Sequence, residues 1–207
     1  MVHPRLTFAL SVIEALAILS FAISGFIEAR KRRLDAIGTF LVALATAFGG
    51  GTMRDVLLER RPFYWVEHQA YVIVIFVLSF FAQYVMRMVS LVISERALLI
   101  ADAIGLGLFS ISGTSVALDS GMPWFTAAMM GVVTGVFGGI MRDVLCNDVP
   151  LILRDSRPYA TCAFAGCWLY VLLARLDVDP IYCLLAASAL ILIARLVTFK
   201  LNVRLPH

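Results

Sequence analysis

The sequence is poor in charged residues. Only 15% of its 207 residues are charged, whereas 61% are hydrophobic, and the mean hydropathy is +0.93. A composition this apolar excludes an ordinary soluble domain. Apolar runs of about 20 residues are long enough to cross a bilayer as helices. The chain is therefore predicted to be an integral membrane protein with almost nothing left for a domain outside the membrane.

The sequence also lacks the residue patterns of an enzyme, a metal centre or a nucleic-acid surface. The three histidines have no ligand spacing around them, and the four cysteines lie in or beside apolar segments without paired spacing. Neither a zinc site nor a disulfide framework is expected. The net charge of +3 is small and its basic residues are spread over loops, so no nucleic-acid partner is predicted. Because no catalytic set or phosphate-binding loop is present, we predict no enzymatic activity and no cofactor.

Seven apolar segments with short loops between them are present. They cover residues 6–27, 36–58, 70–92, 97–118, 123–146, 159–176 and 180–199. A basic cluster at residues 30–33 follows the first segment, and cytoplasmic loops are enriched in basic residues. This cluster predicts an outside N-terminus and a cytoplasmic C-terminus. Arg87 with Arg96, Arg154 with Arg157 and Lys200 with Arg204 agree with this topology, whereas Arg60 and Arg61 count against it.

Two glycine motifs interrupt the second and fifth segments. GGGTMRDVL occupies residues 49–57, and its near copy GGIMRDVL occupies residues 138–145, with the shared MRD triplets 88 positions apart. Glycines weaken a helix, and backbone groups freed inside a bilayer need partners from protein, water or an ion. Both helices are therefore predicted to be broken beside a polar cavity. The residues of these breaks are Gly49, Gly50 and Gly51 in the second segment and Gly138 and Gly139 in the fifth.

The repeat continues beyond the motifs without a gap. Equivalent positions at the same offset are Glu14 and Asp102, Ser24 and Ser112, and Thr46 and Thr134. Three segments separate equivalent points, so the two units lie in the membrane in opposite orientations. The predicted fold class is an all-α polytopic membrane protein forming a single domain over residues 1–207. Two inverted three-helix repeats, about residues 6–92 and 97–176, precede a seventh helix at about 180–199.

The arginine and aspartate of each motif place charge at membrane depth. Such groups are costly there and mark a functional site by default. Neighbouring residues point about 100° apart on a helix, so cross-pairing is expected, Arg54 with Asp143 and Asp55 with Arg142. The arginines are then candidate gates at opposite ends of one path. The alternative is that each arginine pairs with an acid and only holds helices together.

Other polar residues complete the candidate path. Glu14 and Asp102 are candidates for attracting a cation or for accepting hydrogen bonds from freed backbone, the alternative being a structural hydrogen bond to a neighbouring helix. The hydroxyls of Ser24, Ser112, Thr46 and Thr134 are candidate pore-lining groups. Serine and threonine also commonly bond the backbone of their own helix, which is the alternative for these four.

The seven spans, the two repeats and the doubled GGxMRDVL motif resemble the bacterial members of the trimeric intracellular cation channel family. These are also catalogued as glycine-transporter-like small inner-membrane proteins. The resemblance covers nearly the whole chain. It implies a bacterial inner-membrane homotrimer, a pore in each subunit formed by bent second and fifth helices, permeant potassium or sodium, and lipid as a bound partner.

The family's pore-forming glycines correspond to Gly49, Gly50 and Gly51 and to Gly138 and Gly139. One departure is visible, because Phe137 stands where the first half has Gly49. The second break is therefore expected to be tighter, with Phe137 as a constriction.

Two functions of different classes follow. The first is a passive monovalent cation channel, in which carbonyl and hydroxyl oxygens replace part of the hydration shell of the ion. The alternative is a secondary carrier for glycine or another small zwitterion, because inverted repeats with broken helices are common in carriers. Ion current without exchange favours the channel, whereas saturable glycine counterflow favours the carrier.

Overall fold

All the regular secondary structure of the described residues is helical. The structure is a computed structural model that describes residues 4–88, 95–154 and 158–203, with side chains for residues 8–81, 95–153 and 158–203. Within these residues the predicted all-α class is confirmed. The helices are α1 (Pro4–Lys31), α2 (Ala36–Leu57), α3 (Tyr64–Glu67), α4 (Gln69–Met88), α5 (Glu95–Asp119), α6 (Trp124–Leu145), α7 (Leu151–Arg154), α8 (Ala160–Arg175) and α9 (Pro180–Lys200).

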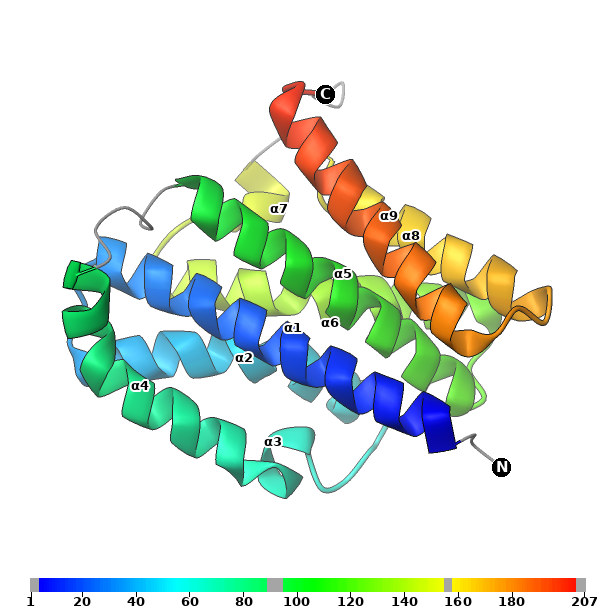
Figure 1. Cartoon of the computed structure of the whole chain (residues 1–207), viewed down its shortest axis with the longest axis horizontal. Helices are drawn as coiled ribbons and strands as arrows, with labels where there is room; N and C mark the ends of the chain where they lie inside the picture. The colour runs from blue at the N-terminus through cyan, green and yellow to red at the C-terminus, as the bar shows by residue number, and fades with distance from the viewer. Residues whose placement is uncertain (1–3, 89–94, 155–157, 204–207) are drawn as a thin grey trace.

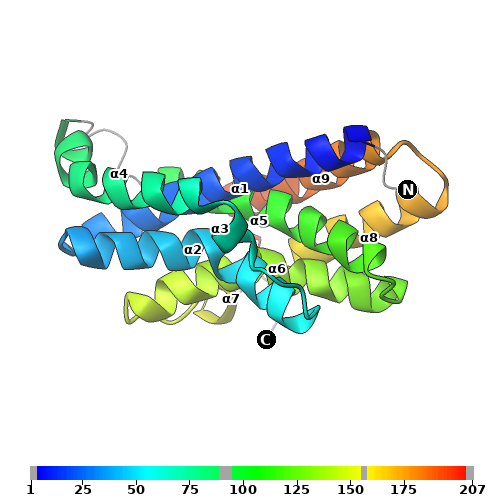
Figure 2. The same cartoon turned by 90° about the horizontal axis from the view of Figure 1, so that it is seen from below.

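Four helices form the centre of the molecule. They pack in the ring order α1, α2, α6, α5, with α5 closing the ring against α1. Figure 1 shows α1 and α5 side by side across the middle, and Figure 2 shows α2 and α6 beneath them. Helix α4 packs on α2 along one flank, whereas α8 and α9 pack on α5 along the other. The two glycine motifs therefore lie on neighbouring central helices.

Two apolar cores flank this centre. One gathers Ile18, Phe21 and Phe109 between the helices of the first half and α5. The other gathers Leu106 and Ile191 among α5, α6, α8 and α9. Helix α5 contributes to both cores, so it joins the two halves of the molecule.

The ends of α2 and α6 share one geometry at equivalent positions. Glu59 follows α2 with a φ of 53°, and Asn147 follows α6 with a φ of 56°. In the first case the N–H of Arg60 donates to the carbonyl oxygen of Asp55 at 2.8 Å, and in the second the N–H of Asp148 donates to that of Asp143 at 2.8 Å. Such bonds satisfy the last carbonyl groups of a helix. The chain therefore reverses in the same way after each copy of the motif.

The predicted helix breaks are wrong, because α2 and α6 run through their glycines as continuous helices. The glycines serve close packing instead. A Cβ atom on Gly50 would lie 2.0 Å from the carbonyl oxygen of Thr134, and one on Gly138 would lie 2.5 Å from that of Thr46. The missing side chains let the two backbones touch, as small residues do between membrane helices. This contact offsets the low helix propensity of glycine.

Five helices of the described chain are long and apolar enough to cross a membrane, namely α1, α2, α5, α6 and α9. Two shorter apolar stretches lie in α4, at Gln69–Phe81, and in α8. The protein is therefore a multi-pass membrane protein. Residues 89–92 of the predicted third segment lie outside the described residues. So do the side chains of Arg87, Arg154, Arg157 and Arg204, on which part of the predicted topology rests.

We expect Gly50→Ala to destabilise the protein by about 1–3 kcal/mol, because the new methyl group must push α2 away from α6. Gly51→Ala is the matched control, since a Cβ atom there would meet nothing within 4 Å. In a helix interior that change gains up to about 1 kcal/mol. The measurement is thermal unfolding of both variants in the same detergent. Equal midpoints for the two variants would contradict the close contact at Gly50.

Candidate functional site

Arg54 lies near the end of α2 in a buried charge cluster. Its side chain is 2% exposed. Its Nη1 donates to Oε1 of Glu14, on α1, at 2.7 Å, and its Nε donates to Oδ1 of Asp55 at 2.9 Å. Ser112, on α5, lies 3.4 Å from the same Nη1 and donates to Glu14 at 2.9 Å. These four residues form the Arg54 cluster, which ties three central helices together.

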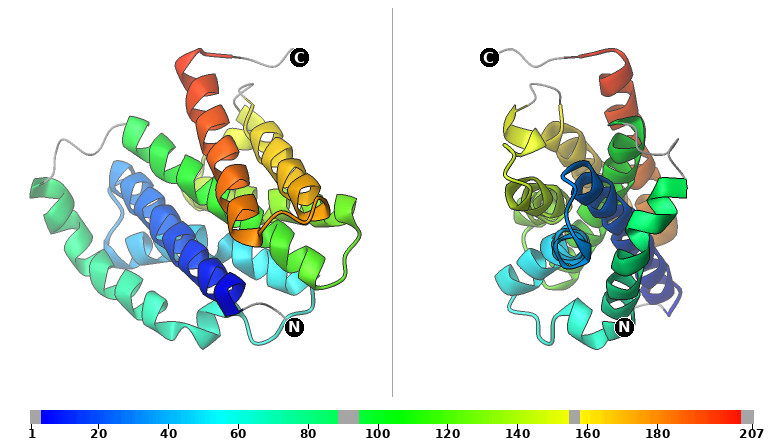
Figure 3. Two further views of the ribbon diagram at one scale, coloured as in Figure 1. Left: turned by 45° about the vertical axis from the view of Figure 1, so that its right-hand side comes forward. Right: turned by 90° about the vertical axis from the view of Figure 1, so that its left-hand side faces the viewer.

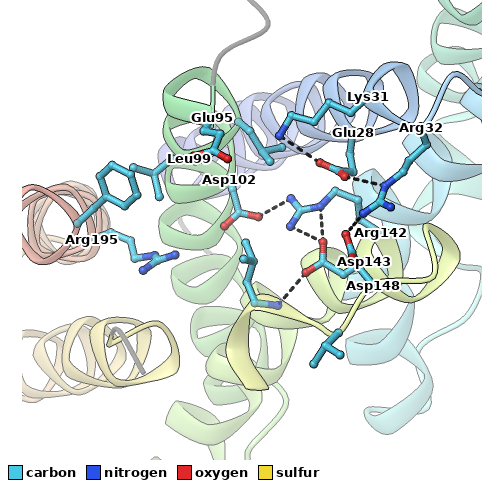
Figure 4. A pocket seen from close by; sticks show the side chains of 14 residues that line it. Glu28, Lys31, Arg32, Glu95, Leu99, Asp102, Arg142, Asp143, Asp148 and Arg195 are labelled. Carbon is cyan, nitrogen blue, oxygen red and sulfur yellow. Dashed lines mark hydrogen bonds and ion pairs between the residues drawn. The ribbon is translucent and has the colours of Figure 1, made fainter. Parts of the chain in front are cut away.

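Arg142 occupies the equivalent place at the end of α6. Its side chain is 1% exposed. Its Nη1 donates to Oδ1 of Asp102, on α5, at 2.7 Å and to Oγ of Ser24, on α1, while its Nε donates to Oδ1 of Asp143 at 2.8 Å. Figure 4 shows the guanidinium of Arg142 between the two carboxylates. These four residues form the Arg142 cluster.

The predicted cross-pairs, Arg54 with Asp143 and Asp55 with Arg142, are wrong. Each arginine pairs with the aspartate next to it and with an acid 40 positions earlier in the chain. An arginine side chain is long enough to turn along its helix and reach the adjacent carboxylate, which an argument from the angle between neighbouring Cβ atoms overlooks.

Each arginine contacts a serine, and not an acid, from the other half of the chain. Ser112 belongs to the second half and joins the Arg54 cluster, whereas Ser24 belongs to the first half and joins the Arg142 cluster. The remaining members of the clusters are related by the offset of 88 positions. The alternative reading, in which arginines pair with acids and hold helices together, therefore describes the contacts that the structure contains.

The second oxygen of each motif aspartate holds the short helix that follows. Oδ2 of Asp55 accepts the N–H of Tyr64 at 3.4 Å, at the start of α3, and Oδ2 of Asp143 accepts the N–H of Leu151 at 2.9 Å, at the start of α7. Burial, together with the nearby charge of Glu14, raises the pKa of the Tyr64 phenol above its usual value, so Tyr64 is neutral at physiological pH. Figure 3 shows α3 and α7 at opposite ends of the molecule.

Each cluster forms the floor of a pocket. The α3 pocket, of about 540 Å³, contains the Arg54 cluster except Ser112, and the α7 pocket, of about 440 Å³, contains the Arg142 cluster except Ser24. The charged residues of the α3 pocket are Glu14, Asp55, Glu67, Asp119, Arg54, Arg60 and Arg61. Those of the α7 pocket are Glu28, Glu95, Asp102, Asp143, Asp148, Lys31, Arg32, Arg142 and Arg195.

The two pockets carry the same formal charge. Four carboxylates stand against three arginines in the α3 pocket, and five carboxylates stand against four basic residues in the α7 pocket. With ordinary ionisation each pocket therefore has a net charge of −1. Pockets of one sign with apolar walls concentrate ions of the other sign.

A packed layer separates the two pockets. The rings of Phe21 on α1 and Phe109 on α5 lie 5.4 Å apart, and both are buried. The ring of Phe21 fills a slot left by two glycines, since a Cβ atom on Gly105 would lie 2.1 Å from it and one on Gly138 would lie 2.7 Å from it. None of the described residues lines both pockets. The described chain is therefore closed in the middle.

The predicted threonine positions lie in this layer. Oγ1 of Thr46 donates to the carbonyl oxygen of Val42 at 2.6 Å, and Oγ1 of Thr134 donates to that of Met130 at 2.7 Å. Both threonines are fully buried. Each hydroxyl therefore donates to a backbone carbonyl of its own helix, which was the alternative to pore lining in the sequence analysis.

The remaining predicted residues are spread around the crossing of α2 and α6. Gly49 faces Met141, and Gly51 faces open space. A Cβ atom on Gly139 would lie 3.2 Å from the hydroxyl of Tyr159. Phe137 is partly exposed and lines neither pocket. A constriction at Phe137 stays a prediction, whereas the aromatic contact in the central layer involves Phe21 and Phe109.

Sequence reasoning missed three residues of this region. Phe21 and Phe109 occupy equivalent positions of the repeat, and their symmetry is a signal that was available. Arg195 is the only charged residue inside α9 before its last turn, and a lone ionisable group within an apolar span is also a signal. Arg195 is 3% exposed and lines the α7 pocket.

A double-mutant cycle separates the observed pairs from the expected ones. We expect Arg54→Gln and Glu14→Gln to be coupled by about 0.5–3 kcal/mol, because their charged groups are in direct contact. Arg54→Gln and Asp143→Asn are expected to be additive within about 0.5 kcal/mol, because they belong to different clusters. The measurement is chemical unfolding in detergent. Coupling in the second pair and additivity in the first would support the cross-pairs instead.

Comparisons with known proteins show which proteins this chain is similar to. A family model described as "Glycine transporter" matches residues 11–87 and 99–175. The UPF0126 inner membrane protein YadS of Escherichia coli strain K12 is 38% identical over 146 residues, which cover 70% of each chain. The solved structure of the TRIC trimeric intracellular cation channel orthologue from Rhodobacter sphaeroides is 32% identical, with a TM-score of 0.85 over 94% of this chain and 98% of that one. A second structure, described as the structural basis for conductance through TRIC cation channels, is 34% identical, with a TM-score of 0.83 over 95% of this chain and 96% of that one.

The two family matches begin at residues 11 and 99, so they are offset by the same 88 positions as the glycine motifs. They and the solved structures cover most of the chain, including both charge clusters and the helix crossing. The chain belongs to the family that contains the UPF0126 membrane proteins and the TRIC cation channels.

Proposed function

We propose that this protein is a passive channel for monovalent cations such as potassium, with a conducting path in each subunit. The path runs from the α3 pocket, through the crossing of α2 and α6, to the α7 pocket. The observation that carries the proposal is the pair of net negative pockets at opposite ends of the same four central helices. The description of the related solved structures as cation channels supports it.

The paired arginines remove the main objection to a cation path. An unpaired arginine in a narrow path would repel cations. Arg54 has carboxylates at 2.7 and 2.9 Å, and Arg142 has carboxylates at 2.7 and 2.8 Å. Each cluster therefore has a net charge of −1, and a cation that enters meets carboxylate and hydroxyl oxygens. Such oxygens replace part of the hydration shell of a permeant ion.

Conduction requires the central layer to open. Phe21 and Phe109 are the bulky groups of that layer, and the glycine contact between α2 and α6 is the place where two helices slide with least obstruction. Small sliding motions between packed helices are a common form of conformational change. A shift of α6 that moves Gly138 away from the Phe21 ring opens the slot in which the ring sits. We assign the gate to this layer.

We further propose that seven helices cross the membrane, with α4 and α8 joining the five longer ones as two inverted repeats and a final helix. The start of α1 and the end of α9 lie at opposite ends of the molecule (Figure 3), as an odd number of crossings requires. Lys31 and Arg32 line the α7 pocket, so the positive-inside rule puts that pocket on the cytoplasmic side. The N-terminus then lies outside, and the inner-membrane relative supports a bacterial inner membrane.

A homotrimer is proposed on two grounds. The Rhodobacter sphaeroides relative is described as trimeric. The present chain also exposes large apolar side chains along its flanks, such as Phe80 and Phe81 on α4 and Leu185 and Ile193 on α9. Faces of this kind suit lipid and neighbouring subunits.

A carrier for glycine is the second candidate, and the description of the family model favours it. Such a carrier would alternate the access of one substrate site between the two sides of the membrane. Two matched negative pockets suit a cation better than a zwitterion, which has no net charge. The two functions differ in whether transport saturates and exchanges.

The first test is single-channel recording of the purified protein in a planar bilayer with a potassium gradient. We expect unitary currents that reverse near the potassium potential in wild type. Gly50→Leu and Gly139→Leu are expected to abolish them, because the larger side chains obstruct the crossing and the approach to Arg142. A silent wild-type bilayer, combined with saturable counterflow of labelled glycine in vesicles, would overturn the channel and support the carrier.

The second test addresses the gate. Phe21→Ala and Phe109→Ala are expected to raise the open probability several-fold, because each removes a ring from the central layer. Phe8→Ala is the matched control, since Phe8 also lies on α1 but is 73% exposed. Recordings are compared after gel filtration has confirmed that each variant is folded. Unchanged gating in both variants would place the gate elsewhere.

A further inference from the structure

The two carboxylate oxygens of Asp102 have different surroundings. Oδ1 accepts a hydrogen bond from Arg142 at 2.7 Å, whereas Oδ2 is buried and has no hydrogen-bond partner among the described residues. The Asp102 side chain is 1% exposed and lines the α7 pocket. Glu14, its equivalent in the first half, has no buried oxygen without a partner. A buried polar atom of this kind requires a partner from outside the chain, either water or a ligand.

Arg195 supplies an unpartnered group of the opposite charge. It is 3% exposed, and its Nε is buried with no hydrogen-bond partner among the described residues. Its Nη1 lies 3.5 Å from the carbonyl oxygen of Pro158, a long hydrogen bond, and its guanidinium carbon lies 4.4 Å from the centre of the Tyr159 ring. No carboxylate of the described chain lies within 4.0 Å of it, whereas Arg54 and Arg142 each have two.

The two groups line the same pocket without pairing with each other. In Figure 4, Arg195 and Arg142 lie on opposite sides of Asp102, and the guanidinium of Arg195 points into the pocket. A Cβ atom on Gly139 would lie 3.2 Å from the hydroxyl of Tyr159 and 3.4 Å from Oδ1 of Asp102, so the glycine keeps a side chain out of the space beside these oxygens. Two opposite charges are therefore held apart in a pocket of about 440 Å³.

The neighbouring charges of the pocket compensate one another. Glu28 pairs with Lys31 at 3.5 Å and with Arg32 at 3.3 Å, and Asp143 pairs with Arg142 at 2.8 Å. Figure 4 shows these pairs on the far side of the pocket from α9. Among the described residues, the two unpartnered atoms are therefore the exceptions.

The signs of these two atoms define the ligand that fits. A purely cationic ligand at Asp102 meets the positive charge of Arg195, and a purely anionic ligand at Arg195 meets the negative charge of Asp102. A ligand with one group of each sign pairs with both. It brings no net charge, so the pocket keeps its formal charge of −1. One carboxylate oxygen and one guanidinium match one ammonium group and one carboxylate.

We propose that the α7 pocket binds a small zwitterion, of the amino-acid class, between Asp102 and Arg195. The ammonium group of the ligand donates to Oδ2 of Asp102. The carboxylate of the ligand accepts hydrogen bonds from Nε and one Nη of Arg195, the two-pronged arrangement for which arginine is suited. The ring of Tyr159 supports the guanidinium through a cation–π contact. Leu99 and Phe199 line the pocket and offer an apolar wall to the carbon chain of the ligand.

This site differs from the substrate site of a carrier. A carrier presents one site alternately to the two sides of the membrane, whereas the described residues of the α3 pocket have no buried charged atom without a partner. The site therefore belongs to one side of the protein. Binding there requires neither conduction nor transport, so it is tested without measuring either.

The test is isothermal titration calorimetry on the full-length protein in detergent. The probes are glycine, β-alanine and γ-aminobutyrate, which carry both charges at increasing separation, and ethylamine and propionate, which carry one charge each. We expect one of the three zwitterions to bind roughly tenfold or more tightly than either singly charged probe. Arg195→Gln and Asp102→Asn are each expected to weaken that binding roughly tenfold or more, because removing one partner of a buried charge pair leaves the other uncompensated.

Two matched controls remove exposed charges from the same helices. Lys200→Gln on α9 and Glu95→Gln on α5 are expected to change the affinity by less than about twofold, because both side chains lie in solvent, where such charges contribute little. A loss of affinity in these controls as large as in Arg195→Gln would attribute the binding to the overall charge of the pocket and would overturn the bridged site.

The other outcomes are equally decisive. If none of the zwitterions binds, or if they bind wild type and Arg195→Gln equally, the proposal is wrong and water is the partner of the two atoms. Should the Asp102→Asn or Arg195→Gln protein fail to fold, derivatives of the best zwitterion replace the variants. Its methyl ester lacks the negative charge, and its N-acetyl form lacks the positive charge. Either derivative binding wild type as tightly as its parent would contradict the contact that it removes.

Discussion

A charge buried between helices is costly unless an opposite charge lies beside it, and the packing of the four central helices supplies such partners to Arg54 and Arg142. Arg54 and Arg142 are among the largest fully buried side chains of the described chain. Each takes one carboxylate from its own helix, a second from α1 or α5, and a hydroxyl from the other half. Because breaking a buried pair leaves an uncompensated charge, each cluster holds three of the central helices together at one end of the molecule.

The two charge clusters lie at opposite ends of the central helices, and the middle of these helices is packed. The charge clusters lie in two pockets with a net negative formal charge, whereas the layer between them consists of aromatic rings and helix backbones in direct contact. A layer in which backbones touch has few side chains to rearrange. In the proposed channel, this layer opens by a displacement of whole helices, and the groups that meet the ion differ from the groups that block its path.

The internal repeat was the feature of the architecture that the sequence predicted best. The offset of 88 positions, the all-helical class and the family followed from motifs that lie in continuous sequence. The glycines were recognised but misinterpreted, since α2 and α6 stay helical through them. Low helix propensity is a local property, and here the contact of Gly50 with Thr134 and of Gly138 with Thr46 overrides it. Nothing within one motif reveals that the other motif lies against it.

Composition and the internal repeat were enough to predict a membrane protein with two similar halves, and the doubled motif was enough to find Arg54, Asp55, Arg142 and Asp143, although not Arg195. Which charges pair depends on the fold, because partners such as Arg54 and Glu14 lie 40 positions apart and meet through the packing of α1 on α2. The fold also decided that Arg195 stands without a carboxylate among the described residues. Periodicity and composition predict whether a segment is buried or lies in a membrane. The partner of a single side chain depends on how the helices pack, and a local sequence pattern does not contain that information.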